Sequence, residues 1–519
     1  MPHPRSEPLA GHGRALRMAE SLLLFASLAA LLCAASRDLG LTWDETSYFT
    51  FSDGVRAWFA QGLPLDQTSL TRSWAYDYFN PHPPFTKILS ALFAGPATAL
   101  VGFPVGYRMG HLLWTAAGLT LAYRMLAAAF GRGRAAVGLA FVLFQPRLFG
   151  EWIIGTTDGP VALAWLLIPL LAWKILEAAP QERRFWRALF IFIAGAAAAS
   201  KITGLLVLFP VAGYFLRRRQ WRETAWLAVA AAWALAFVVM VSPDRWRTPW
   251  SCALEYLLYP FTRNVPITTF YLGKAYLASP PWHYLDVMSW FTFPPLLWAF
   301  LPLAALAWRR QRGLAEALLF PVMFWIALGH WPATPKHDVV REFVGLYPAL
   351  GLLAWLGWQS LLDYWQEKTV GRRRRAGILL LALAPLLLAG ALLRAHPFEL
   401  SYYNVFAGGL PGAEKRGLEM TYYFETLGPD FLREVNRIVE PGKSLGINPY
   451  WPDLLDVDQK HGLLRSDMTI SFDKRGGADY VLLFRRRSAL EDSRYVAAPA
   501  LAEVSRDGVS LTKLVRNSP

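Results

Sequence analysis

The sequence predicts a mainly α-helical protein that crosses a membrane about eleven times and ends in a small external α/β domain. Of its 519 residues 54% are hydrophobic and only 17% are charged, whereas a soluble protein carries about a quarter charged residues. Long apolar runs approach the ~20 residues that a helix needs to cross ~30 Å of hydrocarbon. After residue 394 the composition becomes mixed and polar.

The predicted spans share an apolar run of membrane length. They are 17–36, 107–130, 135–154, 159–177, 187–202, 203–216, 224–242, 287–308, 314–330, 343–364 and 376–394. The first could instead be a cleaved signal peptide, because "CAAS" offers small residues after an apolar core. Since ten spans follow it, we expect an uncleaved helix.

The apolar stretch 85–103 needs a separate decision, because a span there would move every later basic loop to the other compartment. Its Lys87, Gly95 and Pro96 weaken it as a full span. If it lies along the interface, the later basic loops share the cytoplasmic side with the N-terminus, as the positive-inside bias prefers. We therefore expect a juxtamembrane helix within a first external loop at 37–106.

The formal charge of +14 belongs to this hydrophobic part of the chain. From residue 395 on, 16 Lys and Arg stand against 17 Asp and Glu, a net of −1, which leaves +15 in residues 1–394. The excess sits in short runs such as "RRRQWR" (217–222), "RRQR" (309–312) and "GRRRR" (371–375). Runs of this kind are typical of cytoplasmic loops beside a lipid bilayer, so we expect no nucleic-acid partner.

This topology predicts a membrane domain at 1–394 and an external domain at 395–519. Helix-like "PDFLREVNRIVE" (429–440) and strand-like "ADYVLLF" (478–484) predict the α/β character of the second domain. The other external segments are the turn at 155–158 and the loops at 243–286 and 331–342. Only two cysteines are present, Cys33 and Cys252, too few for a disulfide framework or a four-ligand zinc site.

Eight ionisable residues fall at the predicted external ends of helices or in external loops. They are Asp44, Glu45, His82, Asp158, Lys201, Arg263, Lys336 and His337. Ionisable groups near membrane depth are costly unless they are paired or solvated, and by default they mark a functional cavity.

Each of these residues also has an ordinary structural explanation. Asp44 and Asp158 could cap the helices that follow them, and Lys201 could extend to the interface. His82 could be a turn residue in "NPHPPF", and Arg263 or Lys336 could be surface charges. Their convergence on one face favours a site, in which carboxylates supply a general base and cations hold a phosphate. That chemistry suits transfer from a lipid-phosphate donor whose tail stays in the bilayer.

The order of the motifs resembles the GT-C superfold of polyprenyl-phosphate-sugar-dependent glycosyltransferases, especially the protein O-mannosyltransferase and lipid A aminoarabinose transferase branches. "WDETSYF" resembles the acidic pair of their first external loop, and "NPHPPFTKILSALF" their His-Pro-Pro stretch. "GTTDGPVALAWLL" and "SKITGLLVLFP" are similar to the segments before later spans. "SPPWHYL" (279–285) and "KHDVVREFVGLYP" (336–348) match more loosely, and the resemblance covers roughly 40–350.

The resemblance implies a glycosyltransferase of a bacterial inner membrane, with a cytoplasmic N-terminus and an active site and C-terminal domain in the periplasm. Asp44 would be the catalytic base, Glu45 its partner, and Asp158 a third carboxylate of the same cavity. The implied substrate-binding residues are His82, Lys201, Arg263, Lys336 and His337. The partners would be a polyprenyl-phosphate-sugar donor and a lipid, glycan or protein acceptor.

Two departures from the family pattern stand out. The family's Arg-Tyr pair reads Arg341-Glu342 here, which puts a charge where an aromatic would stack on the sugar or carrier. The large mid-chain lumenal domain of eukaryotic protein mannosyltransferases is absent, and a C-terminal extension opens with the aromatic and glycine-rich stretch 396–428. That stretch could form an acceptor platform or pack the domain onto the membrane core.

Three further expectations complete this interpretation. Asp44 and Glu45 are ligand types that could hold a divalent cation, but the mannosyltransferase branch does not generally require one, so we expect no metal and no cofactor. A transporter or flippase of polyprenyl lipids is one alternative, which the lack of an internal repeat disfavours. A non-catalytic envelope assembly protein on the same fold is the other.

Overall fold

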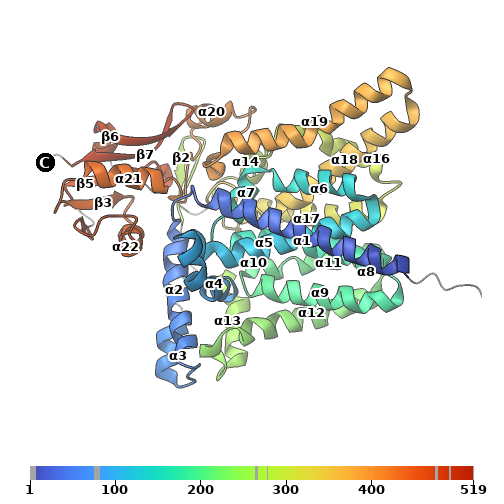
Figure 1. Ribbon diagram of the computed structural model, residues 1–519, viewed down its shortest axis with the longest axis horizontal. Coiled ribbons are helices and arrows are strands. Elements are labelled where there is room, and N and C mark those ends of the chain that lie inside the picture. Colours follow the sequence, from blue (N-terminus) through green and yellow to red (C-terminus); the bar gives the residue numbers. More distant parts are fainter. Residues whose placement is uncertain are drawn as a thin grey trace, which may run out of the picture.

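The computed structural model describes residues 8–74, 82–262, 267–277, 279–473, 477–489 and 493–517. Long helices lie side by side in a bundle, and a small sheet lies beyond one end of it (Figure 1). The long helices are α1 (Pro8–Ser36), α5 (Val105–Phe130), α6 (Arg132–Leu143), α8 (Asp158–Glu177), α9 (Pro180–Ala198), α12 (Trp221–Met240), α17 (Arg312–His330), α18 (Leu346–Lys368) and α19 (Gly371–Ala395).

Helix α8 is the centre of the bundle. In its most apolar window 89% of the residues are buried, and it packs against α5, α9, α17 and α18. A helix that is apolar on all sides is stable only when other helices surround it. The first residue of this central helix, Asp158, is therefore held at a fixed place at one end of the bundle.

Several apolar runs are broken into shorter helices. These are α7 (Pro146–Trp152), α10 (Ile202–Leu205), α11 (Leu208–Arg217), α13 (Pro249–Thr262), α14 (Tyr284–Thr292), α15 (Pro295–Phe300) and α16 (Ala304–Ala307). Pro146 begins α7, and Pro294 and Pro295 separate α14 from α15. Proline lacks an N–H and disfavours a helical residue before it, which explains these two breaks. The breaks on either side of α10 contain no proline.

Among the described residues, six helices are long and apolar enough to cross a membrane, namely α1, α5, α8, α12, α17 and α19. The count becomes seven if α14 and the helices from Pro295 to Ala307, bent by 107° from it, are one span. The expected spans at 187–202 and 343–364 correspond to α9 and α18, and 135–154 to α6 with α7. A multi-pass membrane fold is confirmed, whereas the count of eleven stays a prediction.

The predicted first external loop contains three helices, α2 (Trp43–Ala60), α3 (Gln67–Trp74) and α4 (Phe85–Val101). Helices α2 and α3 run across the end of the bundle nearest the sheet (Figure 1). Helix α4 covers the stretch expected to be juxtamembrane, and it packs on the first turns of α5, where the carbonyl of Leu89 approaches Gly110. It has 17 residues and is shorter than the six candidate spans.

After α19 the chain forms a five-stranded mixed sheet in the order β4-β3-β5-β7-β6. Its strands are β3 (Ser444–Asn448), β4 (Thr469–Ile470), β5 (Tyr480–Phe484), β6 (Ala500–Arg506) and β7 (Val509–Arg516). Strand β3 pairs in parallel with β4 and β5, and β7 pairs antiparallel with β5 and β6. The accompanying helices are α20 (Gly409–Lys415), α21 (Pro429–Ile438), α22 (Pro452–Lys460) and α23 (Ser493–Ala497).

The sheet region and α2 share one apolar core. Tyr48 and Phe49 of α2 belong to the same buried cluster as Leu432 of α21 and Phe484 of β5. A smaller antiparallel hairpin, β1 (Thr269–Tyr271) with β2 (Lys274–Tyr276), contacts this region where Gly273 N–H donates to the carbonyl of Gly417 at 2.9 Å. The C-terminal elements are thus packed against the helix that carries Asp44.

Candidate active site

Helix α2 starts at a capping box that directs Asp44 and Glu45 to different places. Thr42 is the N-cap, its hydroxyl accepts from Glu45 N–H, and the Glu45 carboxylate accepts from Thr42 N–H at 2.9 Å. This reciprocal arrangement satisfies two unpaired donors at the helix start. The suggestion that Asp44 caps the helix is therefore wrong, because Thr42 does so and the Asp44 side chain is left for other partners.

Glu45 is a structural group in this geometry. Its side chain is 0% exposed, and its two carboxylate oxygens accept hydrogen bonds from Nε and Nη2 of Arg108 in α5, at 2.6 and 2.7 Å. The N–H of Gly155 donates to it at 2.6 Å as well. A fully enclosed, bidentate ion pair of this kind fixes the start of α2 against α5 and the turn before α8. These contacts favour the structural alternative for Glu45, and its catalytic partnership with Asp44 stays a prediction.

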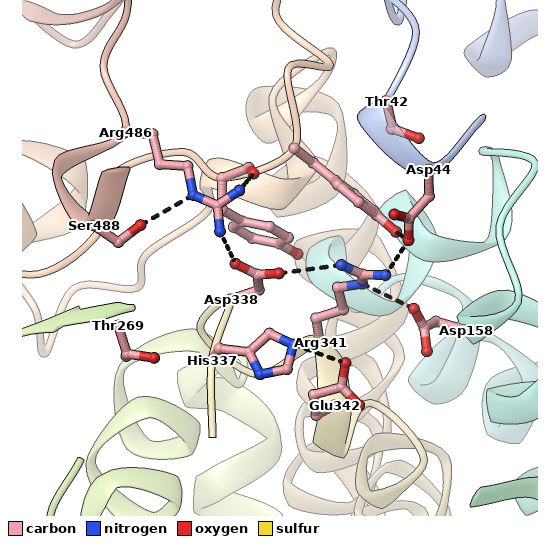
Figure 2. A network of polar contacts seen from close by, with 12 residues as sticks. Thr42, Asp44, Asp158, Thr269, His337, Asp338, Arg341, Glu342, Arg486 and Ser488 are labelled. Carbon is pink, nitrogen blue, oxygen red and sulfur yellow. Dashed lines mark hydrogen bonds and ion pairs between the residues drawn. The ribbon is translucent and has the colours of Figure 1, made fainter. Parts of the chain in front are cut away.

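Asp44 instead belongs to a network of carboxylates around Arg341, drawn in Figure 2. Its Oδ2 accepts a hydrogen bond from the Arg341 guanidinium and another from the Tyr423 hydroxyl, the latter at 2.7 Å. Arg341 also binds Asp158 at 2.9 Å and Asp338 at 3.1 Å. One cation therefore holds three carboxylates from separate parts of the chain in a single arrangement.

Lys201 extends the network on the far side of Asp158. Its ammonium group lies 2.7 Å from Asp158 and 3.0 Å from Glu342, and His337 lies 3.2 Å from the other oxygen of Glu342. Burial on its own would raise the pKa of Glu342, but Lys201 and His337 outweigh it and hold that pKa well below its usual value. Lys201 pairs with both of these carboxylates and does not extend to the interface, and Thr157, not Asp158, is the N-cap of α8.

The segment that carries Arg341 has an uncommon backbone. Asp338 and Val339 have φ values of 52° and 61°, a left-handed conformation that is a genuine outlier for a β-branched residue. Such strain persists only where surrounding structure holds it, and it is found mostly at functional sites. Here Arg486 holds Asp338 at 2.7 Å from its other side.

The remaining expected residues lie outside this network. Lys336 donates to the Ser279 hydroxyl and the Trp331 carbonyl, each at 3.1 Å, and burial lowers its pKa. Within the described part of the chain Lys336 makes no hydrogen bond or ion pair with the network around Arg341, and its expected role in binding the donor stays a prediction. Arg263 lies outside the described residues.

His82 lines a cavity of about 220 Å³ together with Arg245, Glu255 and Ile202. Ile202 directly follows Lys201, so this cavity adjoins the network along the chain. The carbonyl of His82 accepts from the buried ammonium group of Lys87 at 2.5 Å, and that ammonium lies 5.0 Å from the Tyr48 ring. His82 is therefore connected to the network indirectly, through Lys87 beside Tyr48 of α2 and through Ile202 of α10.

Sequence reasoning missed several members of the site. Glu342 and Arg341 were noticed only as a departure, and Asp338, Tyr423 and Arg486 not at all. The clearest available signal was the density of charge in "KHDVVRE", residues 336–342, since buried charges require partners.

Metal binding has no support in the part of the chain that the structure describes. There, no three His, Cys, Asp or Glu side chains are grouped so that they could hold an ion. The carboxylates near Asp44 meet Arg341 and Lys201 instead. Chemically, the arrangement offers a partly exposed carboxylate, Asp44 with 22% of its side chain accessible, in front of buried cations.

Comparison with known proteins agrees with this architecture. A family model described as dolichyl-phosphate-mannose-protein mannosyltransferase matches residues 81–243, less than half of the chain. No curated protein matches the sequence significantly.

Two solved structures cover nearly the whole chain. The crystal structure of ArnT from Cupriavidus metallidurans in the apo state has 16% sequence identity and a TM-score of 0.50, over 96% of this chain and 98% of that one. The structure of the same protein bound to undecaprenyl phosphate has 17% identity and a TM-score of 0.51, over 95% and 97%. The expected fold class is confirmed, and the chain is similar in fold to ArnT along almost its entire length.

Proposed function

We propose that this chain is a membrane glycosyltransferase that moves a sugar from a polyprenyl-phosphate donor to a hydroxyl acceptor, with Asp44 as the base. The observation that carries the proposal is the network itself, in which one partly exposed carboxylate stands before two buried cations. The match of residues 81–243 to a mannosyltransferase model supports it, as does a fold shared with a protein solved with undecaprenyl phosphate bound.

The proposed reaction is a direct displacement. The acceptor oxygen forms a bond to the anomeric carbon, the bond from that carbon to the phosphate oxygen breaks, and the polyprenyl phosphate leaves with the electron pair. The acceptor proton goes to Asp44, whose contacts among the described residues all fall on Oδ2 and leave Oδ1 to face the acceptor.

In the proposed reaction the buried cations also stabilise the leaving phosphate. Among the residues that the structure describes, Lys201 uses two of its three N–H donors, on Asp158 and Glu342, and the third would donate to a phosphate oxygen. Fixed cations in a site that excludes water stabilise the charge that develops on a leaving phosphate. Arg341 contributes by holding Asp44 and Asp158 at a constant separation.

We also propose an inner-membrane location with the sheet region in the periplasm. The start of α19, which carries the basic run 371–375, lies at the end of the bundle opposite the sheet (Figure 1). Basic loops favour the cytoplasmic side, so this arrangement supports an external site at α2. The acceptor would then be a periplasmic lipid, glycan or protein hydroxyl.

The test compares cells that make the wild-type protein, Asp44→Asn or Asp53→Asn. Asp53 is a matched control, because it lies on the same helix but bonds to Tyr107 and Arg56 outside the network. Mass spectrometry of surface lipids, glycans and proteins should find a one-sugar increment in the wild type and control, and none with Asp44→Asn at equal protein level. An unchanged increment in Asp44→Asn would remove Asp44 as the base.

A further inference from the structure

A short segment from the C-terminal part of the chain crosses the site. We name residues 419–426, "EMTYYFET", the C-terminal strap. Its backbone pairs with the chain just before and at the start of α2, because the Tyr423 carbonyl accepts from Trp43 N–H at 3.3 Å and the Glu425 carbonyl from Gly40 N–H at 2.9 Å. The strap is therefore hydrogen-bonded to the same turn that presents Asp44.

Tyr423 is the strap residue that enters the network. Its hydroxyl donates to Oδ2 of Asp44 at 2.7 Å, and the guanidinium of Arg341 lies 4.2 Å from the centre of its ring. Burial raises the pKa of Tyr423 well above its ordinary value, so the hydroxyl keeps its proton and acts as a donor. One side chain thus contacts both the proposed base and the cation that holds it.

Arg486 fastens the strap to the segment that carries Arg341. It reaches Asp338 at 2.7 Å, the carbonyl of Tyr422 at 2.9 Å and the Ser488 hydroxyl at 3.0 Å (Figure 2). Its guanidinium also covers the Trp43 ring at 4.0 Å. These contacts tie the strap, the strained turn at Asp338 and the start of α2 into one unit.

Phe424, next to Tyr423, has a φ of 69°. A bulky residue in this left-handed region is strained and needs the surrounding structure to hold it there. Its ring stacks on Phe484 at 4.3 Å, within the apolar core shared by α2 and the sheet. The strain turns the chain so that Phe424 enters this core while Tyr423 faces Asp44.

We propose that Tyr423 is a positioning residue for Asp44 and that the C-terminal strap is an integral wall of the active site. The inference rests on the proposed function for its catalytic consequence, but the hydrogen bond and its geometry do not. It also bears on the role of the aromatic stretch 396–428, for which an acceptor platform and packing onto the membrane core were the alternatives. At Tyr423 that stretch contacts the proposed base, so it does more than pack against the membrane helices.

The geometry predicts how the loss of the hydroxyl acts. Two groups hold Oδ2 of Asp44, Arg341 and Tyr423, and other titratable groups nearby are Tyr48 of α2 and, beyond Arg341, Asp158. Without the Tyr423 hydroxyl, Asp44 keeps its charge partner but can rotate about it. We expect kcat to fall about 10- to 100-fold, the range for one hydrogen bond to a charged group.

The first arm of the test is a thermal double-mutant cycle on the full-length protein in detergent, which needs no activity. Tyr423→Phe should lower Tm in the wild type. In the Asp44→Ala background the same change should leave Tm equal or raise it, because the hydroxyl there is buried without its acceptor. Tyr480→Phe, which removes a hydroxyl in β5, is the control and should shift Tm equally in both backgrounds.

The second arm is the kinetic split in proteoliposomes with a polyprenyl-phosphate sugar. We expect Tyr423→Phe to lower kcat and leave the donor KM within about twofold, since it touches the base and not the carrier. If Tyr423→Phe only damaged the structure, the amount of active protein would fall, and the change in Tm would be the same in the wild type and in the Asp44→Ala background.

The outcomes separate the two claims. Additive Tm shifts, or a wild-type kcat in Tyr423→Phe while Asp44→Asn is inactive, would overturn the positioning role and leave the proposed function in place. Full activity in Asp44→Asn would instead overturn the proposed function, and the thermal cycle would still decide whether Tyr423 binds Asp44.

Discussion

Arg341→Lys is the perturbation that most strongly tests the network. Arg341 is 6% exposed and meets Asp44, Asp158 and Asp338 with three different nitrogens. Lysine keeps the charge but presents a single ammonium group, so it can satisfy one or two of these carboxylates and not all three.

The magnitude follows from what each carboxylate retains. Asp158 still has Lys201 and Asp338 still has Arg486, whereas Asp44 keeps, among the described residues, only the Tyr423 hydroxyl. Breaking a buried ion pair costs about 3–5 kcal/mol, and because two of the three acids retain a cation we expect the lower end, about 3 kcal/mol. Displacement of Asp44 should reduce kcat/KM about 100-fold.

The assay measures Tm in detergent and transfer in proteoliposomes for the wild type, Arg341→Lys and a control. Arg310→Lys is the control, because Arg310 also pairs with two carboxylates but is 59% exposed, where such pairs contribute ~0–1 kcal/mol. We expect a lower Tm and a lower rate for Arg341→Lys alone. Wild-type Tm and rate in Arg341→Lys would refute the view that one guanidinium organises the site.

Two further predictions concern groups that hold the site in place. Glu45→Gln leaves Arg108 buried without its charge partner, so the free energy of unfolding should fall by about 3–5 kcal/mol. A normal Tm together with lost turnover would instead support a catalytic role for Glu45. His396 joins Glu399 and Asp38 at 2.6 and 2.9 Å, and the hydrogen bond to Glu399 outweighs burial and raises its pKa to about 9. Because the folded value lies above the unfolded ~6.5, its stabilisation is complete below pH ~6.5 and is lost as pH rises through about 9. The Tm advantage of the wild type over His396→Gln should shrink across that range, and a constant difference would contradict the assignment.

The fold was predictable where it depends on composition. Apolar length and basic loops indicate a helical membrane protein, and the strand-like run at 478–484 did become β5. Apolar composition alone does not reveal where a run breaks, so α6 and α7 were merged although Pro146 marks their boundary. The number of spans stays open for the same reason, because α9 and α18 are long enough but lack the uninterrupted apolar stretch that the six candidates have.

The site was predictable as a set of charges and not as a set of contacts. Asp44, Asp158, Lys201 and His337 do meet, because helix ends and the loops between them converge at one end of the bundle. Adjacent residues on a helix point about 100° apart, and this separates Glu45 from Asp44 in a way that charge alone does not predict.

The aromatic partner of Arg341 was beyond sequence reasoning for a different reason. The family pattern has a tyrosine directly after this arginine, but this chain has Glu342 there, and the ring that stacks on Arg341 belongs to Tyr423 of the C-terminal strap. Contacts between such distant segments depend on tertiary packing, here on the core shared by α2 and the sheet.

The most direct test of the central claim is the release of polyprenyl phosphate by purified protein. Wild-type protein in proteoliposomes, supplied with a polyprenyl-phosphate sugar and an envelope extract as the acceptor source, should release free polyprenyl phosphate in step with sugar transfer. Asp44→Asn should release none above background, and Asp53→Asn should match the wild type. Equal release by Asp44→Asn and the wild type would contradict a transfer reaction that depends on this carboxylate.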